Sequence, residues 1–289
     1  MQKTVKHVDL KPFKSIGIGV AFSPNLKANL FEAARLSVYF NAKLFLIHVG
    51  EASDDKTNTL SEILKSFEKD NLNFEVVFKT GNPVDVILSV SEEKKIDLLI
   101  LGAVQRERIV KYYLGSIARK ITRQATCSVL LMVKPSIESV PCQHIVVNGL
   151  KDPKTEHTIT AAFYLAEKLN SQKITIVEEI NKNEITVKVD DDKSLRHASI
   201  LKKRIALREN ARINEIISHI PEAYTTNKTI KLQPIFGKKG YSIGHYAQIS
   251  RADLLVMNAP TKTSFWDRLF PHDIEHILTE LPTDVLILQ

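Results

Sequence analysis

The segment DLLILGAVQRERIVKYYLGSIARKITRQATCSVLLM, residues Asp97–Met132, decides the fold class. It contains two nearly continuous apolar runs, Asp97–Gly102 and Ser128–Val133, with a helical stretch at Ser116–Gln124 between them. Strands that are apolar along their whole length are buried on both faces, and strands that alternate with helices are typical of a parallel sheet covered by helices. The segment therefore predicts an α/β fold.

The alternation of strand and helix continues upstream of this segment. Apolar, β-branched runs predict three more strands, and apolar residues spaced three and four apart predict the helices between them. The predicted strands are Ser15–Ala21, Lys43–Val49 and Phe74–Lys79. Together with the two runs above, they predict a sheet of five parallel strands in the first half.

The second half repeats this architecture after a linker that contains two prolines, Lys134–Pro141. RADLLVMNAP at Arg251–Pro260 matches KIDLLILGAV at Lys95–Val104. A repeat of roughly 140 residues is too long for a solenoid and is typical of a duplicated domain. We therefore predict two tandem domains, residues 1–137 and 138–289. The strands predicted for the second are His144–Gly149, Lys173–Glu178, Thr229–Ile235, Asp253–Met257 and Asp284–Leu288.

Composition excludes several classes of protein. The 289 residues are 44% hydrophobic, and no apolar run approaches the roughly 18–20 residues of a membrane span. The start has no apolar core of a secretory signal. Cys127 and Cys142 do not form a CxxC pair, which excludes a disulfide framework or a cysteine zinc module. The net charge of +7 is mild basicity and does not by itself indicate nucleic acid binding. We expect a cytoplasmic protein without membrane insertion.

A glycine pattern follows the strand that ends at Gly102. Two residues separate Gly102 from Gln105, and nine more lead to Gly115 and Ser116. With this spacing, residues 13–134 resemble the universal stress protein family, whose ATP-binding members carry G-x2-G-x9-G-S/T after strand four. The resemblance implies two tandem Rossmann-like domains of the adenine nucleotide alpha hydrolase-like type. In each domain it implies five parallel strands in the order 3-2-1-4-5, with helices on both faces.

The resemblance implies an ATP or phosphate site built from Gly102, Gln105, Gly115, Ser116 and Val49. Glycine lets backbone N–H groups approach phosphate, and a helix N-terminus adds a positive dipole end. Ser116 could donate its hydroxyl to phosphate, or it could simply cap the helix. Val49 fits the family position near adenine, or it could be an ordinary buried strand residue.

Two departures from the family pattern weaken this site. Gln105 replaces the second glycine, and its side chain crowds the approach and makes a positive φ costly. Ala21 stands where ATP-binding members commonly have an aspartate. We therefore expect no cofactor, or ATP with magnesium bound weakly and without turnover. The basic residues Arg106 and Arg108 could instead compensate for the lost glycine, or they could form a solvated face.

The second half has lost the glycines. Asn258, Thr261 and Pro271 stand in their places, and proline has no N–H to donate. The loop Ser264–Phe270, with the single tryptophan, Trp266, could form a contact surface or fill the empty pocket. His272 and His276 are four residues apart on a predicted helix but lack a third ligand, so we expect no metal site.

The helix predicted over Arg196–Ile217 is rich in lysine and arginine. It could dock a partner or an anionic surface. It could also simply cover the sheet with its basic side in water, and a doubly wound sheet needs a helix in this place.

Three functions fit these observations. The first is a non-enzymatic tandem universal stress protein that acts in stress response through protein contacts or weak ligand binding. The second is an ATP-binding switch, which could hydrolyse ATP slowly in the first domain. The third is a soluble regulatory module of a membrane transporter. Partners would be other proteins or the chain itself, as a homodimer or as a pseudo-dimer through Ser128–Val133 and Asp284–Leu288, because family dimers commonly pair through the last strand.

Overall fold

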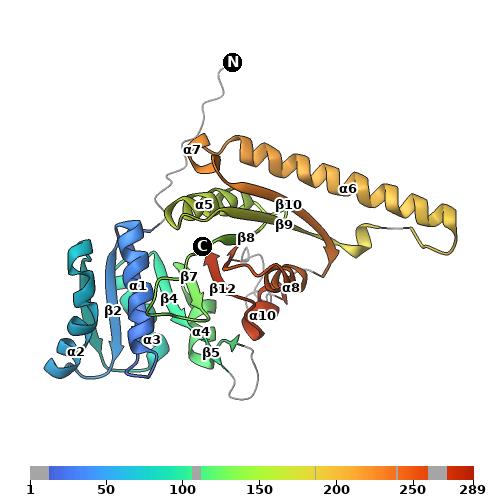
Figure 1. The fold of residues 1–289 in the computed structure, drawn as a ribbon. Helices are drawn as coiled ribbons and strands as arrows, with labels where there is room; N and C mark the ends of the chain where they lie inside the picture. The colour runs from blue at the N-terminus through green and yellow to red at the C-terminus, as the bar shows by residue number, and fades with distance from the viewer. Residues whose placement is uncertain (1–12, 106–111, 186, 239, 260–271) are drawn as a thin grey trace. The chain divides into compact units, whose positions relative to one another are not determined.

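The computed structural model describes residues 13–105, 112–185, 187–238, 240–259 and 272–289, apart from the side chains of residues 104–105 and 272–275 (Figure 1). The chain folds into two compact units. One comprises Lys11–Pro141 together with Leu278–Gln289, and the other contains Cys142–Ile277. The division at Pro141 lies at the end of the predicted linker. It lies four residues beyond the predicted boundary at residue 137, and the last segment of the chain groups with the first half.

The first unit has a parallel sheet with strand order β3-β2-β1-β4-β7. This is the order 3-2-1-4-5 expected from the resemblance, so the expectation is confirmed for the first half. The inner strands β4 and β7 are largely apolar because helices cover both faces, whereas the outer strand β3 carries Glu75 and Lys79. Their bounds are Ser15–Val20 for β1, Lys43–Val49 for β2, Phe74–Lys79 for β3, Leu98–Gly102 for β4 and Ser128–Met132 for β7.

A sixth strand of the first unit comes from the end of the chain. β12 (Asp284–Leu288) pairs antiparallel with β7, with Leu286 opposite Leu130. The Asp284 carboxylate accepts a hydrogen bond from the Val133 N–H over 2.7 Å. The predicted contact between the two last strands is therefore confirmed. An unpaired β7 would be a pairing hazard, and β12 covers it.

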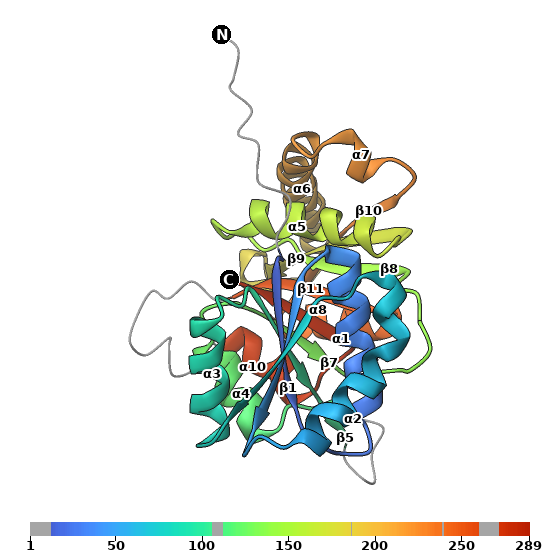
Figure 2. The same ribbon diagram turned by 90° about the vertical axis from the view of Figure 1, so that its left-hand side faces the viewer.

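Four α-helices cover the first sheet. Figure 2 shows α1 and α2 on one face and α3 and α4 on the other. α3 begins sharply because Pro83 occupies its first position and the Asn82 side chain accepts a hydrogen bond from the Val84 N–H. The helices are α1 (Leu26–Phe40), α2 (Asp54–Leu64), continued by the 3-10 helix η1 (Lys65–Asp70), α3 (Pro83–Glu93) and α4 (Ser116–Gln124).

The second unit has parallel strands in the order β10-β9-β8-β11. This order repeats the 3-2-1-4 arrangement of the first sheet, as the duplication in the sequence predicts. The core strands β8 and β11 are buried at every position. The bounds are His144–Asn148 for β8, Lys173–Asn181 for β9, Thr229–Gly237 for β10 and Leu254–Asn258 for β11.

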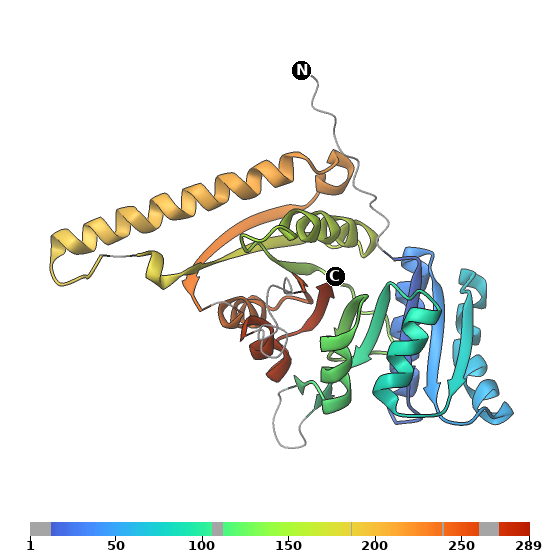
Figure 3. The ribbon, with the colours of Figure 1, turned by 180° about the vertical axis from the view of Figure 1, so that it is seen from behind.

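Helices also cover the second sheet, with α5 and α6 on one face and α8 on the other (Figure 3). The Asp191 carboxylate accepts from the Ser194 N–H and fixes the start of α6, which runs for 27 residues. The charged stretch Lys182–Ser194 contains the 3-10 helix η2 and the start of α6. The elements are α5 (Thr155–Lys168), η2 (Lys182–Glu184), α6 (Asp192–Ser218), α7 (Glu222–Thr225), α8 (Tyr241–Ile249) and α10 (His272–Thr279). No helix in the described ranges is both long and apolar enough to cross a membrane.

Candidate functional site

The first candidate site lies at the carboxyl ends of three adjacent strands, β2, β1 and β4. Val49 ends β2, Ala21 follows β1 and Gly102 ends β4. The chain leaves β1 and β4 toward opposite faces of the sheet, and ligands of open α/β sheets bind at such a switch point. Ala21 and Gly102 are exposed and Val49 is half-buried, so the strand ends are accessible.

An asparagine from α1 lies beside Gly102. A Cβ on Gly102 would be 3.8 Å from Asn29 Oδ1 and 4.0 Å from its Nδ2. Asn29 Oδ1 is buried and has no hydrogen-bond partner in the described part of the chain. A carbonyl oxygen accepts hydrogen bonds, so this atom suits a hydroxyl or N–H of a ligand and not an ionised phosphate oxygen.

The helix start after the loop keeps part of the family pattern. Gly115 is the residue that caps α4, with extended backbone at φ −61° and ψ 161°. Ser116 is the first helical residue, so it does not serve as the capping residue. Its side chain is exposed at the positive end of the helix dipole, where it can donate to an anion.

The loop between Gly102 and Gly115 forms a hairpin. Val104–Gln105 (β5) pairs antiparallel with Tyr112–Tyr113 (β6), with Gln105 opposite Tyr112. Gln105 is therefore part of a short strand. Arg106 and Arg108 lie outside the described residues.

This hairpin is tied to the C-terminal segment of the same unit. The Leu281 N–H donates to the Tyr112 carbonyl oxygen over 3.0 Å, and the Leu114 N–H donates to the Leu278 carbonyl oxygen over 3.3 Å. Arg119 also donates to the Leu278 carbonyl oxygen, over 3.1 Å. Backbone groups next to the candidate phosphate site thus already form hydrogen bonds with another segment of the chain.

Aromatic rings cluster at the ends of β1 to β3, beside Val49. The His48 ring contacts Phe22 edge-on at 5.2 Å and Phe78 at 5.7 Å between ring centroids. His48 Nδ1 also donates to the Val20 carbonyl oxygen over 3.0 Å. Phe22 is still 43% exposed, so it offers a ring surface near the strand ends.

The second unit has a different arrangement at the matching strand ends. Gly149 follows β8, and its N–H donates to the Val177 carbonyl oxygen over 2.8 Å. In this register Glu178 of β9 occupies the position that His48 occupies in the first unit. Glu178 is 2% exposed, and neither of its carboxylate oxygens has a hydrogen-bond partner in the described ranges.

An arginine from α6 joins this group. Arg212 Nη2 donates to the Gly149 carbonyl oxygen over 2.6 Å and lies 3.7 Å from the Glu178 carboxylate. Arg212 Nε donates to Glu209 over 2.9 Å. Burial raises the pKa of Glu178 to about 7, against the lowering effect of Arg212 and with a further raising effect of Glu209. In the second unit, the side chains of Arg212 and Glu178 therefore lie at the carboxyl end of its first strand, β8.

Other residues expected to matter in the second half lie partly outside the described ranges. Asn258 is described, and it is buried at the end of β11. The structure does not describe Thr261, the loop Ser264–Phe270 or Pro271. Among the described residues, no group of three or more histidine, cysteine, aspartate or glutamate side chains is arranged to hold a metal ion.

Comparison with known proteins decides the family. Residues 12–134 match the sequence model described as "Universal stress protein family". Residues 12–134 thus form a domain of the universal stress protein family. A universal stress protein of Methanothermobacter thermautotrophicus is 32% identical over 79 residues, which are 25% of this chain and 53% of that protein. The chain thus spans about half the length of this curated relative.

Solved structures share the fold along nearly the whole chain. A protein of unknown function from Pseudomonas aeruginosa PAO1 has a TM-score of 0.71 at 15% identity, covering 96% of this chain and 93% of that one. A universal stress protein from Archaeoglobus fulgidus DSM 4304 has a TM-score of 0.62 at 14% identity, covering 98% and 99%. The cytoplasmic domain of a prokaryotic cation chloride cotransporter has a TM-score of 0.52 at 13% identity, covering 95% of each chain. At these identities the likeness establishes the fold alone.

The sequence analysis missed the polar group around Arg212 in the second unit. Its signals are present in the sequence. Glu178 and Glu179 interrupt the otherwise apolar run ITIVEEI in β9, and two adjacent acids in a buried strand need partners. Arg212 follows Glu209 by three residues, the spacing that places both on one helix face.

Proposed function

We propose that this chain is a non-enzymatic tandem universal stress protein that acts in stress response through protein contacts. The observation that carries the proposal is the pairing of the β5–β6 hairpin with residues 278–281. In the ATP-binding pattern that the chain resembles, the loop between strand four and the next helix holds phosphate. Here backbone groups of the same loop form hydrogen bonds with residues 278–281 of the same chain. Ligand binding at the first-unit site is at most weak, and no cofactor is needed.

A surface on α6 supports the role of protein contacts. Its sequence from Lys193 to Arg208 contains six lysine and arginine residues and no aspartate or glutamate. Arg196, Ile200, Lys203 and Leu207 follow one another at spacings of four, three and four, so they share one helix face. All four are exposed, and Ile200 and Leu207 are large apolar side chains that are 52% and 60% exposed.

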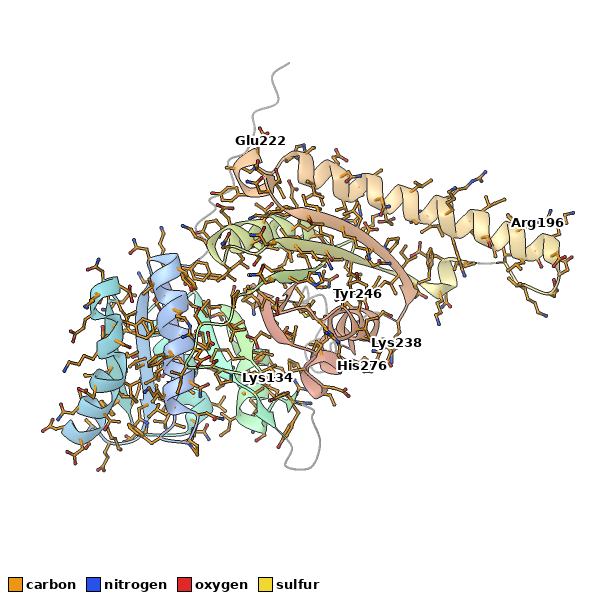
Figure 4. All side chains as sticks on the ribbon, viewed as in Figure 1. Lys134, Arg196, Glu222, Lys238, Tyr246 and His276 are labelled. Atoms are coloured by element: carbon orange, nitrogen blue, oxygen red, sulfur yellow. The ribbon has the colours of Figure 1, made fainter. Side chains whose placement is uncertain are left out.

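This α6 face is directed away from the sheet. The residues of α6 that are buried are Ala198, Ile205, Glu209 and Ile213, on the opposite side of the helix. Figure 4 shows Arg196 at the end of α6 that extends beyond the strands. Two apolar anchors two turns apart, flanked by cations, fit a groove with an acidic rim.

The ATP-binding switch is the second candidate, and Ser116 favours it. Its exposed hydroxyl stands at the N-terminus of α4, where it could reach a phosphate. The third candidate is a transporter module. Its support is that the chain shares its fold with the cytoplasmic domain of a cotransporter.

Native mass spectrometry of the freshly purified chain tests the proposal. We expect the mass of the chain without a bound nucleotide, and no change when ATP and magnesium are added. A co-purified mass near that of ATP would favour the switch instead.

The α6 face has its own test. The double variant Ile200→Glu/Leu207→Glu should lose partners that the unchanged chain captures from extracts of its source cells. Ile249→Glu is the matched control, because Ile249 is 64% exposed on α8. Equal capture by all three proteins would contradict a docking role for α6.

A further inference from the structure

A cluster of charged side chains lies between α6 and β9 in the second unit. We call it the Glu178 cluster, and it consists of Glu178 of β9 with Arg208, Glu209 and Arg212 of α6. Glu178 is 2% exposed, whereas the Arg208 side chain is 63% exposed, so the cluster runs from the core to the surface. Because α6 lies along one face of the second sheet (Figure 3), the cluster joins this helix to the sheet.

The charges of the Glu178 cluster balance only when Glu178 is neutral. Glu209 accepts hydrogen bonds from Arg208 Nε over 2.8 Å and from Arg212 Nε over 2.9 Å. Arg208 also pairs with Glu184 of η2 over 3.3 Å. Two arginines thus already face two carboxylates, and an ionised Glu178 adds a third negative charge inside the protein. A buried carboxylate without its own counter-ion takes up a proton instead.

The surroundings of Glu178 agree with a neutral carboxyl group. Neither of its oxygens has a hydrogen-bond partner in the described part of the chain. The charged groups that act on it are Arg212 and Glu209 of α6, and the described residues of β8, β10 and α5 add none. Pro234 of β10 lies opposite Glu178 in the sheet. Burial accordingly raises the pKa of Glu178 to about 7, so its charge changes close to neutral pH.

Two acceptors lie near the guanidinium of Arg212. Its Nη2 donates to the Gly149 carbonyl oxygen over 2.6 Å and lies 3.7 Å from Glu178 Oε1, which is beyond hydrogen-bond distance. A carboxylate attracts a guanidinium more strongly than a neutral carbonyl group does. Because Nη2 must shift to reach Glu178, pairing with the ionised carboxylate loosens the bond to Gly149.

The loop between β8 and α5 is the segment that Arg212 holds. Its first residue, Gly149, packs directly on β9, since a Cβ there would lie 3.3 Å from Glu178 Cγ. The next residue, Leu150, has a carbonyl oxygen that accepts from the Thr155 hydroxyl at the start of α5. The bond from Arg212 to Gly149 therefore ties α6 to the path from β8 to α5.

From these observations we infer that the Glu178 cluster is a pH-sensitive switch between α6 and the loop that follows β8. Below neutral pH, Glu178 carries a proton and Arg212 ties α6 to the Gly149 carbonyl oxygen. Above neutral pH, Glu178 gives up this proton to water, Arg212 moves to pair with it, and the loop is released. The inference concerns the buried side of α6 and does not depend on a partner at the exposed face.

Hydrogen exchange of the full chain at about pH 5.5 and about pH 8.5, on either side of the transition, tests the inference. At the higher pH, the amides of residues 150–152 should exchange about tenfold faster in the unchanged chain than in Glu178→Gln. The reason is that the variant cannot ionise and keeps the bond from Arg212 to Gly149. At the lower pH the two proteins should exchange at equal rates. Comparing two proteins at one pH removes the intrinsic pH dependence of amide exchange.

Two variants of α6 and its C-terminal end are the controls. Glu215→Gln removes an exposed carboxylate three residues after Arg212, and it should keep the exchange rates of the unchanged chain within about twofold. Histidine also changes charge near neutral pH. His219, directly after α6, lies 3.9 Å from Glu156, and His219→Gln should likewise keep the rates at both pH values.

Nuclear magnetic resonance of the unchanged chain gives a reading that needs no variant. The amide signal of Leu150 should shift with pH in one step, with a midpoint within about one unit of pH 7. In Glu178→Gln the signal should stay at its low-pH position throughout.

The inference is wrong if the Leu150 signal does not move between the two pH values. Equal exchange in the unchanged chain and Glu178→Gln at the higher pH would also overturn it. A difference that is equally large at both pH values would do the same, because it would come from the substitution and not from the charge. Loss of the transition in His219→Gln would assign it to that histidine. Thermal melts verify that each variant is folded.

Discussion

The carboxyl end of the first strand differs between the two units of this chain. After β1, Ala21 and Phe22 are exposed and the strand end is open. After β8, the Gly149 carbonyl oxygen is bound by Arg212, and a buried glutamate stands beside it. The topology of the strands is the same in both. The comparison shows that a duplicated fold can keep its sheet and exchange the chemistry at its strand ends.

The different side chains at the two strand ends have an energetic consequence. The first unit keeps an exposed helix start at Ser116, which costs little in the absence of a ligand because water satisfies it. The second unit buries Glu178 next to Glu209, so Arg212 must compensate two carboxylates. A buried charge without its partner is strongly destabilising. The second unit thus relies on Arg212 beside both carboxylates, with Arg208 as a second donor to Glu209, where the first unit has solvent.

The largest expected effect comes from the end of the chain. Deletion of residues 284–289 removes four buried side chains, Val285–Leu288, each at 2% exposure or less. At about 1.5–3 kcal/mol each, the loss is about 6 kcal/mol or more, so β7 should become exposed and unprotected. Hydrogen exchange of the β7 amides measures this. Gln289→Ala should change β7 protection little, and full protection of β7 after the deletion would show that β12 does not stabilise the first sheet.

Loss of Arg212 should have the next largest effect. Arg212→Met leaves Glu178, Glu209 and the Gly149 carbonyl oxygen without their shared donor, and should destabilise the second unit by about 3 kcal/mol. Chemical unfolding measures the change. Arg204→Met is the control, since Arg204 is exposed on the same helix and forms no ion pair with another described residue. Equal losses in the two variants would mean that the buried group has no special role.

Ionisation of Glu178 should make the stability of the second unit depend on pH. Its pKa rises from an ordinary 4.5 to about 7 on folding, so the folded chain binds more protons than the unfolded chain between these values. The stability of the unchanged chain therefore falls as pH rises through this window. Glu178→Gln should be more stable than the unchanged chain by about 1–3 kcal/mol at pH 8, and the difference should disappear near pH 4. Unfolding at both pH values tests this, with exposed Glu184→Gln as the control. A difference that does not vary with pH would contradict the raised pKa.

The smallest expected effect is a difference in alkylation rate between the two cysteines. Burial raises the pKa of the Cys127 thiol to about 11, while Cys142 is half-buried. Because the thiolate is the reactive form, an alkylating reagent at pH 8 should modify Cys142 well before Cys127 in the folded chain. Peptide mass spectrometry reads both sites. Equal rates would mean that the start of β7 opens as easily as the segment before β8.

The strands of both halves could be predicted from the sequence to within a few residues. Continuous apolar runs such as LLIL in β4 have no other stable place than a sheet covered on both faces. The departures at Ala21 and Gln105 were also visible, because they are single positions in a spaced motif.

The contacts that define the two sites could not be predicted. Glu178 and Arg212 are 34 residues apart, and the sequence does not fix which turn of a long helix faces the end of a strand. The β5–β6 hairpin depends on Leu278 and Leu281, which follow it by more than 150 residues. Such contacts arise from the tertiary fold and leave only weak local signals.

The β5–β6 hairpin binds residues 278–281 of its own chain, and on this basis we propose that the first unit does not hold ATP tightly. Isothermal titration of the full chain with ATP and magnesium tests it most directly. We predict a dissociation constant weaker than about 100 μM, no turnover, and little change in Gly115→Asp. Sub-micromolar binding of ATP that Gly115→Asp abolishes would contradict the account.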